Sequence, residues 1–392
     1  MIDSIAIAQT GLHGYEQGLR TISNNTANLN TPGFKGSVTQ FANLAQPDSG
    51  MGSGSRFGDA GLGLNALGTS LDFSQGQLQN SSNPLDLAID GRGFFMLRDE
   101  KGGLHYTKDG QFKFDGDGVL VAQTTGEQVM SLDADGNLMP VTLTDQQTAP
   151  AQATTTITFG GNLASTVTSA TVGNVTVIDS IGSLHTLTLR LTTLTGQAGK
   201  WTVALMDGTA TVGTATLGFT NGKSTTGSSV LAFNYTPAGG TAMALNLDFS
   251  TNVSSIDFGG TTTLAMTSQD GRSVGQLNGT SFDDTGTLVL SYSNGQTVKK
   301  NQLALAQFNS ADDVVDLGSN EYAAKQGQAW QVGVAGGGQF GKVQAGMVEG
   351  SNVDLSRQFS DLVIMQRGYQ ACSQVVSTAG EMLTSLFSMV SK

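Results

Sequence analysis

The side chains best suited to ligate a metal or to act as nucleophiles are few and far apart in this chain. Its only histidines are His13, His105 and His185, and its only cysteine is Cys372. Metal sites built from histidine or cysteine take several ligands at short spacing, and a single cysteine excludes an intrachain disulfide. His185 lies in an alternating Thr/Leu run and Cys372 on an apolar seam. We therefore expect a half-buried strand residue and a small core residue, with no metal or cofactor.

Two pairs of aspartates invite a calcium interpretation. Asp115 and Asp117 form one pair, and Asp133 and Asp135 form the other. Neither stretch has the spacing of an EF-hand, and neither has a glutamate at the required downstream position. Asp-Gly sequences between apolar runs are typical of β-hairpin turns, so we expect turns at both places.

The sequence offers no arrangement suited to catalysis. It lacks a Gly-rich phosphate loop ending in Lys-Ser or Lys-Thr, and residues 52–56 lack the strand and helix that a nucleophile elbow needs. Glu321 and Glu349 have no evident carboxylate partner. We expect a protein that is not an enzyme.

Composition favours a folded, weakly charged protein. The 392 residues are 38% hydrophobic and 13% charged, which excludes wholesale disorder. Lys and Arg number 19 and Asp and Glu 31, so the net charge is 19 − 31 = −12, and we expect neither nucleic acid nor an anionic membrane as partner. The N-terminus has no basic segment followed by a long apolar run, so we expect export without a Sec signal peptide.

Both ends of the chain carry an apolar seam with heptad spacing, in which steps of four and three residues alternate. The N-terminal seam consists of Met1, Ile5, Ala8, Leu12, Tyr15, Leu19, Ile22, Thr26 and Leu29. The C-terminal seam consists of Leu355, Phe359, Leu362, Met365, Tyr369, Cys372, Val376, Ala379, Leu383, Leu386 and Val390. These patterns predict long helices over residues 1–30 and 351–392. A capping box opens the second helix, with Ser351 as N-cap, Asp354 three residues later and Asn352 between them.

The two seams require partners. One interpretation is an antiparallel coiled coil within the chain. The other, which we favour, is that neighbouring subunits cover the remaining apolar surface. Gly11, Gly14 and Gly18 lower the helix propensity of the first segment by about 1 kcal/mol each, so a two-helix coil is marginal alone. The same glycines permit close approach of a neighbouring backbone.

The middle of the chain predicts a nested, mainly β architecture between the two helices. Residues 31–84 are expected to form an extended connector, Gly/Ser-rich and flexible over residues 50–68. Turn signals and short apolar runs predict a β domain in two parts, over residues 85–150 and 269–350. Residues 151–268 contain 7 charged residues among 118, together with 28 threonines, and show clear apolar alternation. That change in composition predicts an inserted all-β outer domain with a Thr-rich surface.

Three stretches closely resemble the flagellar rod/hook axial protein family. The first holds the family signature, composed of Ser23, Asn24, Asn25, Ala27, Asn28, Thr31, Pro32, Gly33, Phe34 and Lys35. The second runs through residues 85–95 and 106–110, where its β domain begins. The third comprises residues 351–355, 366–370 and 381–383 of its C-terminal helix. No family motif is evident in residues 151–268.

The resemblance implies a structural subunit whose copies polymerise into a hollow tube, with terminal helices lining a central channel and β domains outside. The chain length and the inserted domain favour a hook subunit, part of the extracellular curved joint that passes torque from rod to filament. A distal rod subunit is the alternative within the family, and a secreted Thr/Gly-rich adhesin is the alternative from another class. The implied partners are other copies of the chain, the distal rod protein, the hook cap protein, the hook–filament junction protein and the flagellar type III export apparatus.

Overall fold

The computed structural model describes residues 2–44, 63–325 and 330–390 of the chain. The chain divides into two compact units. The first comprises residues 1–144, 280–289 and 299–392, and the second comprises residues 145–279 and 290–298. One boundary between the units lies between residues 144 and 145, and the other three fall within the strands β22 (Gly275–Phe282), β23 (Thr287–Tyr292) and β24 (Thr297–Gln307). The segment expected to form an inserted domain, residues 151–268, belongs entirely to the second unit.

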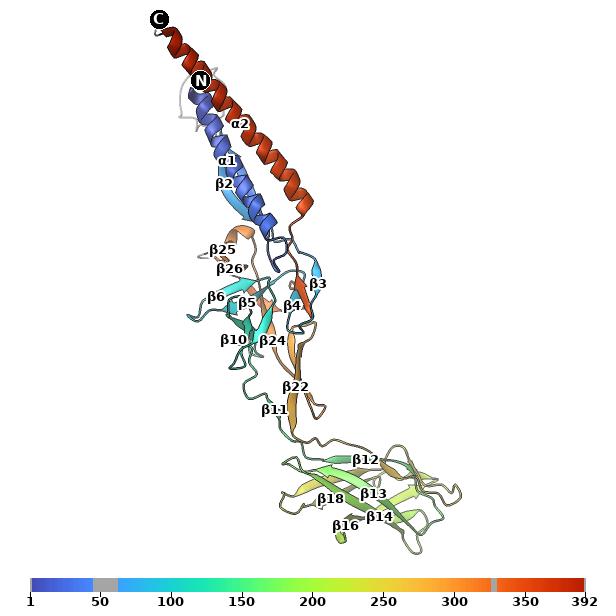
Figure 1. Cartoon of the computed structure of the whole chain (residues 1–392). Coiled ribbons are helices and arrows are strands. Elements are labelled where there is room, and N and C mark those ends of the chain that lie inside the picture. The colour runs from blue at the N-terminus through green and yellow to red at the C-terminus, as the bar shows by residue number, and fades with distance from the viewer. Residues whose placement is uncertain (1, 45–62, 326–329, 391–392) are drawn as a thin grey trace, which may run out of the picture. The chain divides into compact units, whose positions relative to one another are not determined.

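Two long terminal helices accompany the β structure, as the sequence predicts. They are α1 (Ile2–Ala27) and α2 (Leu355–Val390), and they lie side by side in the first unit (Figure 1). At 1.5 Å per residue, the 36 residues of α2 extend for roughly 54 Å. In the described part of the chain, neither helix combines the length and the apolar character needed to cross a membrane.

The start of α2 corrects the predicted capping box. The helix begins at Leu355, and the side-chain Oδ1 of Asp354 accepts hydrogen bonds from the backbone N–H groups of Ser356 (2.8 Å) and Arg357 (3.3 Å). Asp354 is therefore the N-cap. Ser351 instead accepts a hydrogen bond from the N–H of Val353 at 3.3 Å, and Asn352 is bound to other segments. The contacts of Asn352 keep residues 351–353 outside the helix.

The end of α1 and the segment that follows also differ from expectation. The helix ends at Ala27, and Leu29 lies in a turn closed by the bond from the N–H of Thr31 to the carbonyl of Asn28. The expected connector contains the antiparallel pair β1 (Ser37–Asn43) and β2 (Leu64–Leu71), followed by β3 (Leu78–Asn80). Leu64 packs against Gly14, and this contact with α1 accounts for a strand where the sequence suggested flexibility. Residues 50–62 of the predicted flexible stretch lie outside the described residues.

The rest of the first unit is built of short, mostly antiparallel strands. The main path places the strands in the order β24-β9-β5-β6-β26-β25. Strands β8 and β10 pair with β9, β7 pairs with β8, β27 pairs with β24, β28 with β4, and β29 with β3. Their bounds are β4 (Leu87–Asp90), β5 (Phe94–Arg98), β6 (Leu104–Thr107), β7 (Phe112–Phe114), β8 (Leu120–Ala122), β9 (Gln128–Leu132), β10 (Leu138–Pro140), β25 (Val314–Gly318), β26 (Glu321–Ala324), β27 (Gln331–Val334), β28 (Lys342–Ala345) and β29 (Met347–Glu349), with a short 3-10 helix at Ala311–Asp313.

An aromatic cluster forms part of the core of the first unit. The rings of Tyr106 and Trp330 stack with centroids 3.7 Å apart, and Phe94 meets Trp330 edge-on at 5.7 Å. Phe73 and Phe308, whose ring centroids are 4.7 Å apart, both also pack against Phe94. Such aromatic pairs add about 0.5–1.5 kcal/mol each beyond burial, so this cluster holds the strands in one arrangement.

The aspartate pairs occupy tight turns, as predicted. Oδ1 of Asp115 accepts hydrogen bonds from the N–H groups of Asp117 (3.0 Å) and Val119 (2.8 Å). Oδ1 of Asp133 likewise accepts from the N–H groups two and four residues later, at 2.9 and 2.8 Å. These bonds to backbone donors lower the pKa of the Asp133 carboxyl below its ordinary value, and they are the local contacts that favour Asp in turns.

The second unit contains a ten-stranded sheet around its own core. The path runs β13-β14-β15-β16-β17-β20-β12-β19-β18, with β21 paired to β12. The predicted alternation is present, since Leu187, Leu189 and Leu191 on β14 are fully buried. The bounds are β11 (Thr148–Ala149), which pairs with β22, and β12 (Thr156–Asn162), β13 (Ser169–Ile178), β14 (Leu184–Thr193), β15 (Lys200–Asp207), β16 (Ala210–Thr220), β17 (Lys223–Ser224), β18 (Val230–Tyr235), β19 (Met243–Asp248), β20 (Val253–Ser254) and β21 (Ala265–Gln269).

Candidate assembly interface

Glycines allow α1 and α2 to pack closely. A Cβ atom added at Gly11 would lie 2.8 Å from Sγ of Cys372, and one at Gly18 would lie 2.9 Å from Sδ of Met365. Between them, the ring of Tyr15 lies against Gly368 of α2. Gly11 and Gly18 thus make room for side chains of α2, whereas Gly14 makes room for Leu64 of β2, and Cys372 is a half-buried packing residue.

The two predicted seams differ in how far they are covered. On α1, Ile22 is buried, and Ile5, Leu12, Tyr15 and Leu19 are half-buried. On α2, Leu362, Met365, Val376 and Leu383 are half-buried, whereas Leu355, Phe359, Tyr369 and Leu386 are exposed. Met1 and the side chain of Val390 lie outside the description. Within the described residues, packing of α1 on α2 thus leaves much of the C-terminal seam uncovered.

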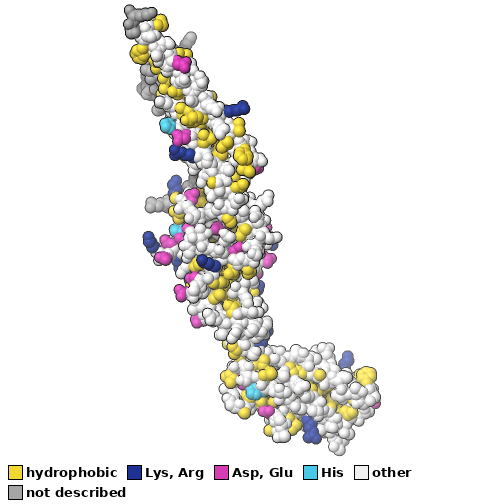
Figure 2. Space-filling model, in the orientation of Figure 1, with side chains coloured by type: hydrophobic (Ala, Val, Ile, Leu, Met, Phe, Trp, Pro, Cys, Tyr) yellow, Lys and Arg dark blue, Asp and Glu magenta, His cyan; other side chains and the backbone are white. Residues whose placement is uncertain are grey.

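A second group of exposed apolar side chains runs along α2, and we call it the apolar stripe. It consists of Ile364 (60% exposed), Val375 (46%), Met382 (53%), Leu386 (49%) and Met389 (79%). Their spacings of 11, 7, 4 and 3 residues place them within roughly 60° of one another around the helix axis at 100° per residue. Figure 2 shows apolar side chains along the helix pair. An exposed stripe of this length is characteristic of a surface that binds another protein.

Between Gln366 and Ser377, the opposite side of α2 is polar. Its exposed residues include Gln366, Gln370, Ser373, Gln374 and Ser377, and in the same helical numbering they centre about two-thirds of a turn from the stripe. Over this stretch the helix presents three kinds of surface, which are the α1 contact, the apolar stripe and a polar face. Nearer the helix ends, Phe359, Val363 and Glu381 lie at the angles of the polar face.

Asn25 of the signature connects α1, β1 and α2. Its Oδ1 accepts a hydrogen bond from the N–H of Ser37 at 2.9 Å, and its Nδ2 donates to the carbonyl of Ser37 at 2.8 Å and to Oε1 of Gln358 at 3.1 Å. Asn25 is 3% exposed. One buried amide thus fixes the position of the chain after α1 relative to the first turn of α2.

The other signature residues shape the loop that follows α1. Asn28 accepts from the hydroxyl of Thr31 at 3.1 Å, and the carbonyl of Pro32 accepts from Nδ2 of Asn320 at 2.9 Å. Gly33 has φ of 71°, and a Cβ there would lie 2.5 Å from the backbone N of Asp109, so only glycine fits without displacement. Ser23, Asn24 and Ala27 are exposed, and Phe34 is half-buried.

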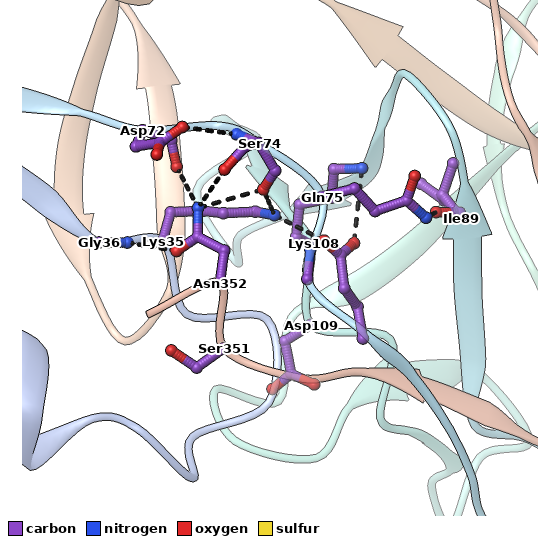
Figure 3. Close-up of polar contacts among 12 residues, drawn as sticks. Lys35, Gly36, Asp72, Ser74, Gln75, Ile89, Lys108, Asp109, Ser351 and Asn352 are labelled. Atoms are coloured by element: carbon purple, nitrogen blue, oxygen red, sulfur yellow. Dashed lines mark hydrogen bonds and ion pairs between the residues drawn. The ribbon is translucent and has the colours of Figure 1, made fainter. Parts of the chain in front are cut away.

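Lys35, the last signature residue, belongs to a buried charged cluster with Glu349 and Lys108. Figure 3 shows Lys35 and Lys108 together with Ser74 and Asn352. Nζ of Lys35 lies 2.6 Å from Oε1 of Glu349 and 2.8 Å from the carbonyl oxygen of Ser74. The side chains of Lys35 and Glu349 have no exposed surface. Oε2 of Glu349 lies 3.6 Å from Nζ of Lys108. Asn352 bonds beside the cluster, donating to the carbonyls of Asp72 (2.7 Å) and Ser74 (3.1 Å). The cluster joins the signature loop to the strand that leads into α2.

Burial perturbs the titration of Lys108. Burial lowers the pKa of Lys108 to about 8, the nearby charge of Lys35 acts in the same direction, and Glu349 partly opposes both. Nζ of Lys108 also donates to the carbonyl of Gly91 at 3.1 Å and lies 5.5 Å from the ring centre of Phe94. Sequence reasoning found no partner for Glu349 and did not single out Lys108. Residues that meet only in the folded chain lie hundreds of positions apart, and no periodic pattern marks them.

The remaining titratable candidates, His185 and His105, lie beside carboxylates. His185 is half-buried, as expected, and its Nε2 lies 2.9 Å from Oδ2 of Asp179. His105 lies between Glu127 and Glu321, so the expectation that Glu321 lacks a carboxylate neighbour is wrong. Burial and the charge of Glu127 raise the pKa of the Glu321 carboxyl.

Comparison with known proteins gives a consistent result along the chain. Residues 5–35 match the family model "Flagella basal body rod protein", residues 88–177 match "Flagellar hook protein FlgE/F/G D1 domain", and residues 344–389 match "Flagellar basal body rod FlgEFG protein C-terminal". These matches, with the paired terminal helices, define an axial protein of the flagellar rod and hook.

Full-length relatives narrow the class. The chain is 32% identical to the flagellar hook protein FlgE of Salmonella typhimurium over 98% of this chain and 100% of that protein, and 31% identical to that of Escherichia coli over 97% and 98%. A solved structure of the Helicobacter pylori hook protein FlgE2 matches with a TM-score of 0.48 and 14% identity, covering 68% of this chain and 99% of that one. The chain belongs to the flagellar hook protein FlgE family, whose members are structural subunits of the extracellular hook rather than enzymes.

Proposed function

We propose that copies of this chain assemble through the apolar stripe of α2, together with the exposed part of the C-terminal seam, to form the inner wall of the hook. The observation that carries the proposal is the set of five stripe residues, all at least 46% exposed although α1 already packs on the same helix. Exposed apolar area of this kind costs free energy in water, roughly 25 cal/mol per Å². Burial against neighbouring copies removes that cost and drives polymerisation.

The polar face of α2 then faces the central channel. Gln366, Gln370 and Gln374 offer hydrogen-bonding groups without charge. An uncharged polar wall neither attracts nor repels charged segments strongly, and this suits a conduit for chains of varied composition. The family resemblance supplies the expectation of a channel, and the three surfaces of α2 support it.

The β units form the outer part of the tube and slide as the hook turns. As a curved universal joint rotates, each row of subunits lengthens and shortens once per turn. Polar, Thr-rich surfaces such as that of the second unit can exchange contacts with little apolar area exposed. A cross-link between outer domains of adjacent subunits that left bending and rotation unimpaired would count against this role.

The assembly partners follow from the position of the hook. The distal rod protein precedes it, the hook cap protein lies at the growing end and the hook–filament junction protein follows it. Subunits reach that end unfolded through the type III export apparatus. A chain with one cysteine and no disulfide to form is compatible with such a route.

Electron microscopy of basal bodies from a strain lacking this chain tests the proposed function. We expect complete rods and rings that end at the cell surface, without hook or filament. A truncated rod would assign the chain to the rod instead. Intact hooks and filaments would refute a role in the hook.

A further inference from the structure

One histidine and two glutamates from separate parts of the chain meet in the first unit. His105 is on β6, Glu127 immediately precedes β9 and Glu321 begins β26. Strand pairing fixes their positions, since Leu97 of β5 pairs with His105 on one side and with Val129 of β9 on the other. Glu321 pairs with Thr107, two residues after His105. The backbone of one sheet thus holds all three side chains together.

The spacing of the donor atoms suits a small divalent cation. Nδ1 of His105 lies 2.7 and 2.9 Å from the two carboxylate oxygens of Glu127 and 3.8 Å from Oε2 of Glu321. One ligand atom from each residue lies within 4.8 Å of the others, and this is the one such group among the described residues. A tetrahedral zinc ion with bonds of about 2.0–2.1 Å needs ligand atoms about 3.3–3.4 Å apart. The two separations from Nδ1 of His105, 2.7 Å to Glu127 and 3.8 Å to Glu321, lie on either side of that value.

We propose that His105, Glu127 and Glu321 bind Zn²⁺ through one imidazole nitrogen and two carboxylates, with water in the fourth position. The donor set is appropriate because imidazole and carboxylate together favour Zn²⁺ over the hard cation Mg²⁺. The side chains of His105, Glu127 and Glu321 are 21%, 14% and 10% exposed, which leaves a path for the ion while excluding most water. A hydrogen bond from Thr125 orients Glu321.

Zinc at this position links the β25–β26 hairpin to the far side of β5. Within the described residues, the hairpin joins the main sheet path only through the pairing of β26 with β6. The residue preceding β26, Asn320, donates the hydrogen bond to the carbonyl of Pro32 in the signature loop. The ion therefore stiffens the part of the β unit that supports the turn after α1.

Isothermal titration calorimetry tests the site directly. The full-length chain is stripped with EDTA, dialysed and titrated with ZnCl₂, and Co²⁺ is used separately to detect coordination by its visible absorption. We expect one equivalent of Zn²⁺ per chain, insensitive to excess Mg²⁺. His105→Gln, Glu127→Gln and Glu321→Gln should each weaken binding by at least about tenfold and alter the Co²⁺ spectrum.

The matched control is His185→Gln, which removes a histidine paired with a single carboxylate, Asp179. This variant should bind Zn²⁺ as the unmodified chain does. Circular dichroism identifies any variant that fails to fold, and the remaining ligand variants then decide the question. The proposal is overturned if the unmodified chain binds no stoichiometric Zn²⁺, or if the folded ligand variants bind it unchanged. In that case His105 and Glu127 form an ion pair only.

Discussion

The buried cluster of Lys35, Lys108 and Glu349 predicts an unequal response to two single substitutions. With both lysines protonated, the cluster carries a net charge of 2 − 1 = +1. Glu349→Gln raises that charge to +2 and leaves two buried ammonium groups without their carboxylate. Lys35→Met lowers it to zero and leaves Glu349 paired with Lys108 at 3.6 Å. Loss of the glutamate charge should therefore destabilise the first unit more than loss of the lysine.

The expected magnitudes follow from burial. Both Lys35 and Glu349 have fully buried side chains, and breaking such a pair typically costs about 3–5 kcal/mol. We expect Glu349→Gln to lower the free energy of unfolding by about 4 kcal/mol. We expect about 2 kcal/mol for Lys35→Met, the scale of one lost hydrogen bond to a charged group. The carbonyl of Ser74, which Lys35 leaves, still accepts a bond from Asn352.

Urea unfolding of the monomeric chain measures the difference. Trp330 lies in the first unit and Trp201 in the core of the second, so a Trp201→Phe background makes fluorescence report on the first unit alone. The destabilisation by Glu349→Gln should also shrink between pH 7 and 9.5. Glu349 raises the pKa of Lys108, so in the variant Lys108 loses its proton at a lower pH than in the unmodified chain and relieves the excess charge.

Equal effects of the two substitutions, or a larger effect of Lys35→Met, would refute the electrostatic reasoning. A penalty for Glu349→Gln that stayed constant with pH would also contradict it. The double variant provides the control, because a cycle of single and double substitutions isolates the interaction between the two residues.

Four further predictions concern single positions. The pKa of Lys108 in the folded chain, about 8, lies below its ordinary value of 10.5, so the unfolded chain binds more protons between these two values. The free energy of unfolding should therefore rise by about 2 kcal/mol from pH 7 to 9.5. Urea unfolding at the two pH values should show this gain in the unmodified chain but not in Lys108→Met. Gly18→Leu should separate α1 from α2 and abolish hooks in electron micrographs, whereas Gly18→Ala should be milder. Asn25→Ala should speed amide hydrogen exchange at Ser37 about 30-fold, corresponding to about 2 kcal/mol, as seen by mass spectrometry or NMR. Ile364→Asp on the apolar stripe should prevent polymerisation measured by light scattering, whereas Gln370→Asp on the polar face should not; equal effects would contradict the assignment of the two faces.

Periodic features of the structure could be predicted from the sequence. The seams at both ends predicted two long helices, and alternation in residues 187–191 predicted a strand with one buried face. These patterns succeed because each follows directly from the repeat of its secondary structure. The glycines of α1 were also informative, since absence of a side chain has the same consequence wherever a neighbouring helix packs.

Features created by distant contacts could not be predicted. The N-cap is Asp354 rather than Ser351, because the side chain of Asn352 bonds to residues almost three hundred positions earlier. Similarly, Glu349 of β29 meets Lys35 of the loop after α1, and pairing of β26 with β6 brings Glu321 to His105. No spacing along the chain marks these pairs. The β1–β2 pair was missed for a related reason, since its support comes from Gly14 of α1.

An atomic cryo-EM structure of the assembled hook is the most direct test of how this chain assembles. The account predicts that the apolar stripe, from Ile364 to Met389, is buried against neighbouring copies. It also predicts that Gln366, Gln370 and Gln374 face the central channel. A tube in which the stripe faces the channel or stays exposed to solvent, while the glutamines are buried between subunits, would contradict the account.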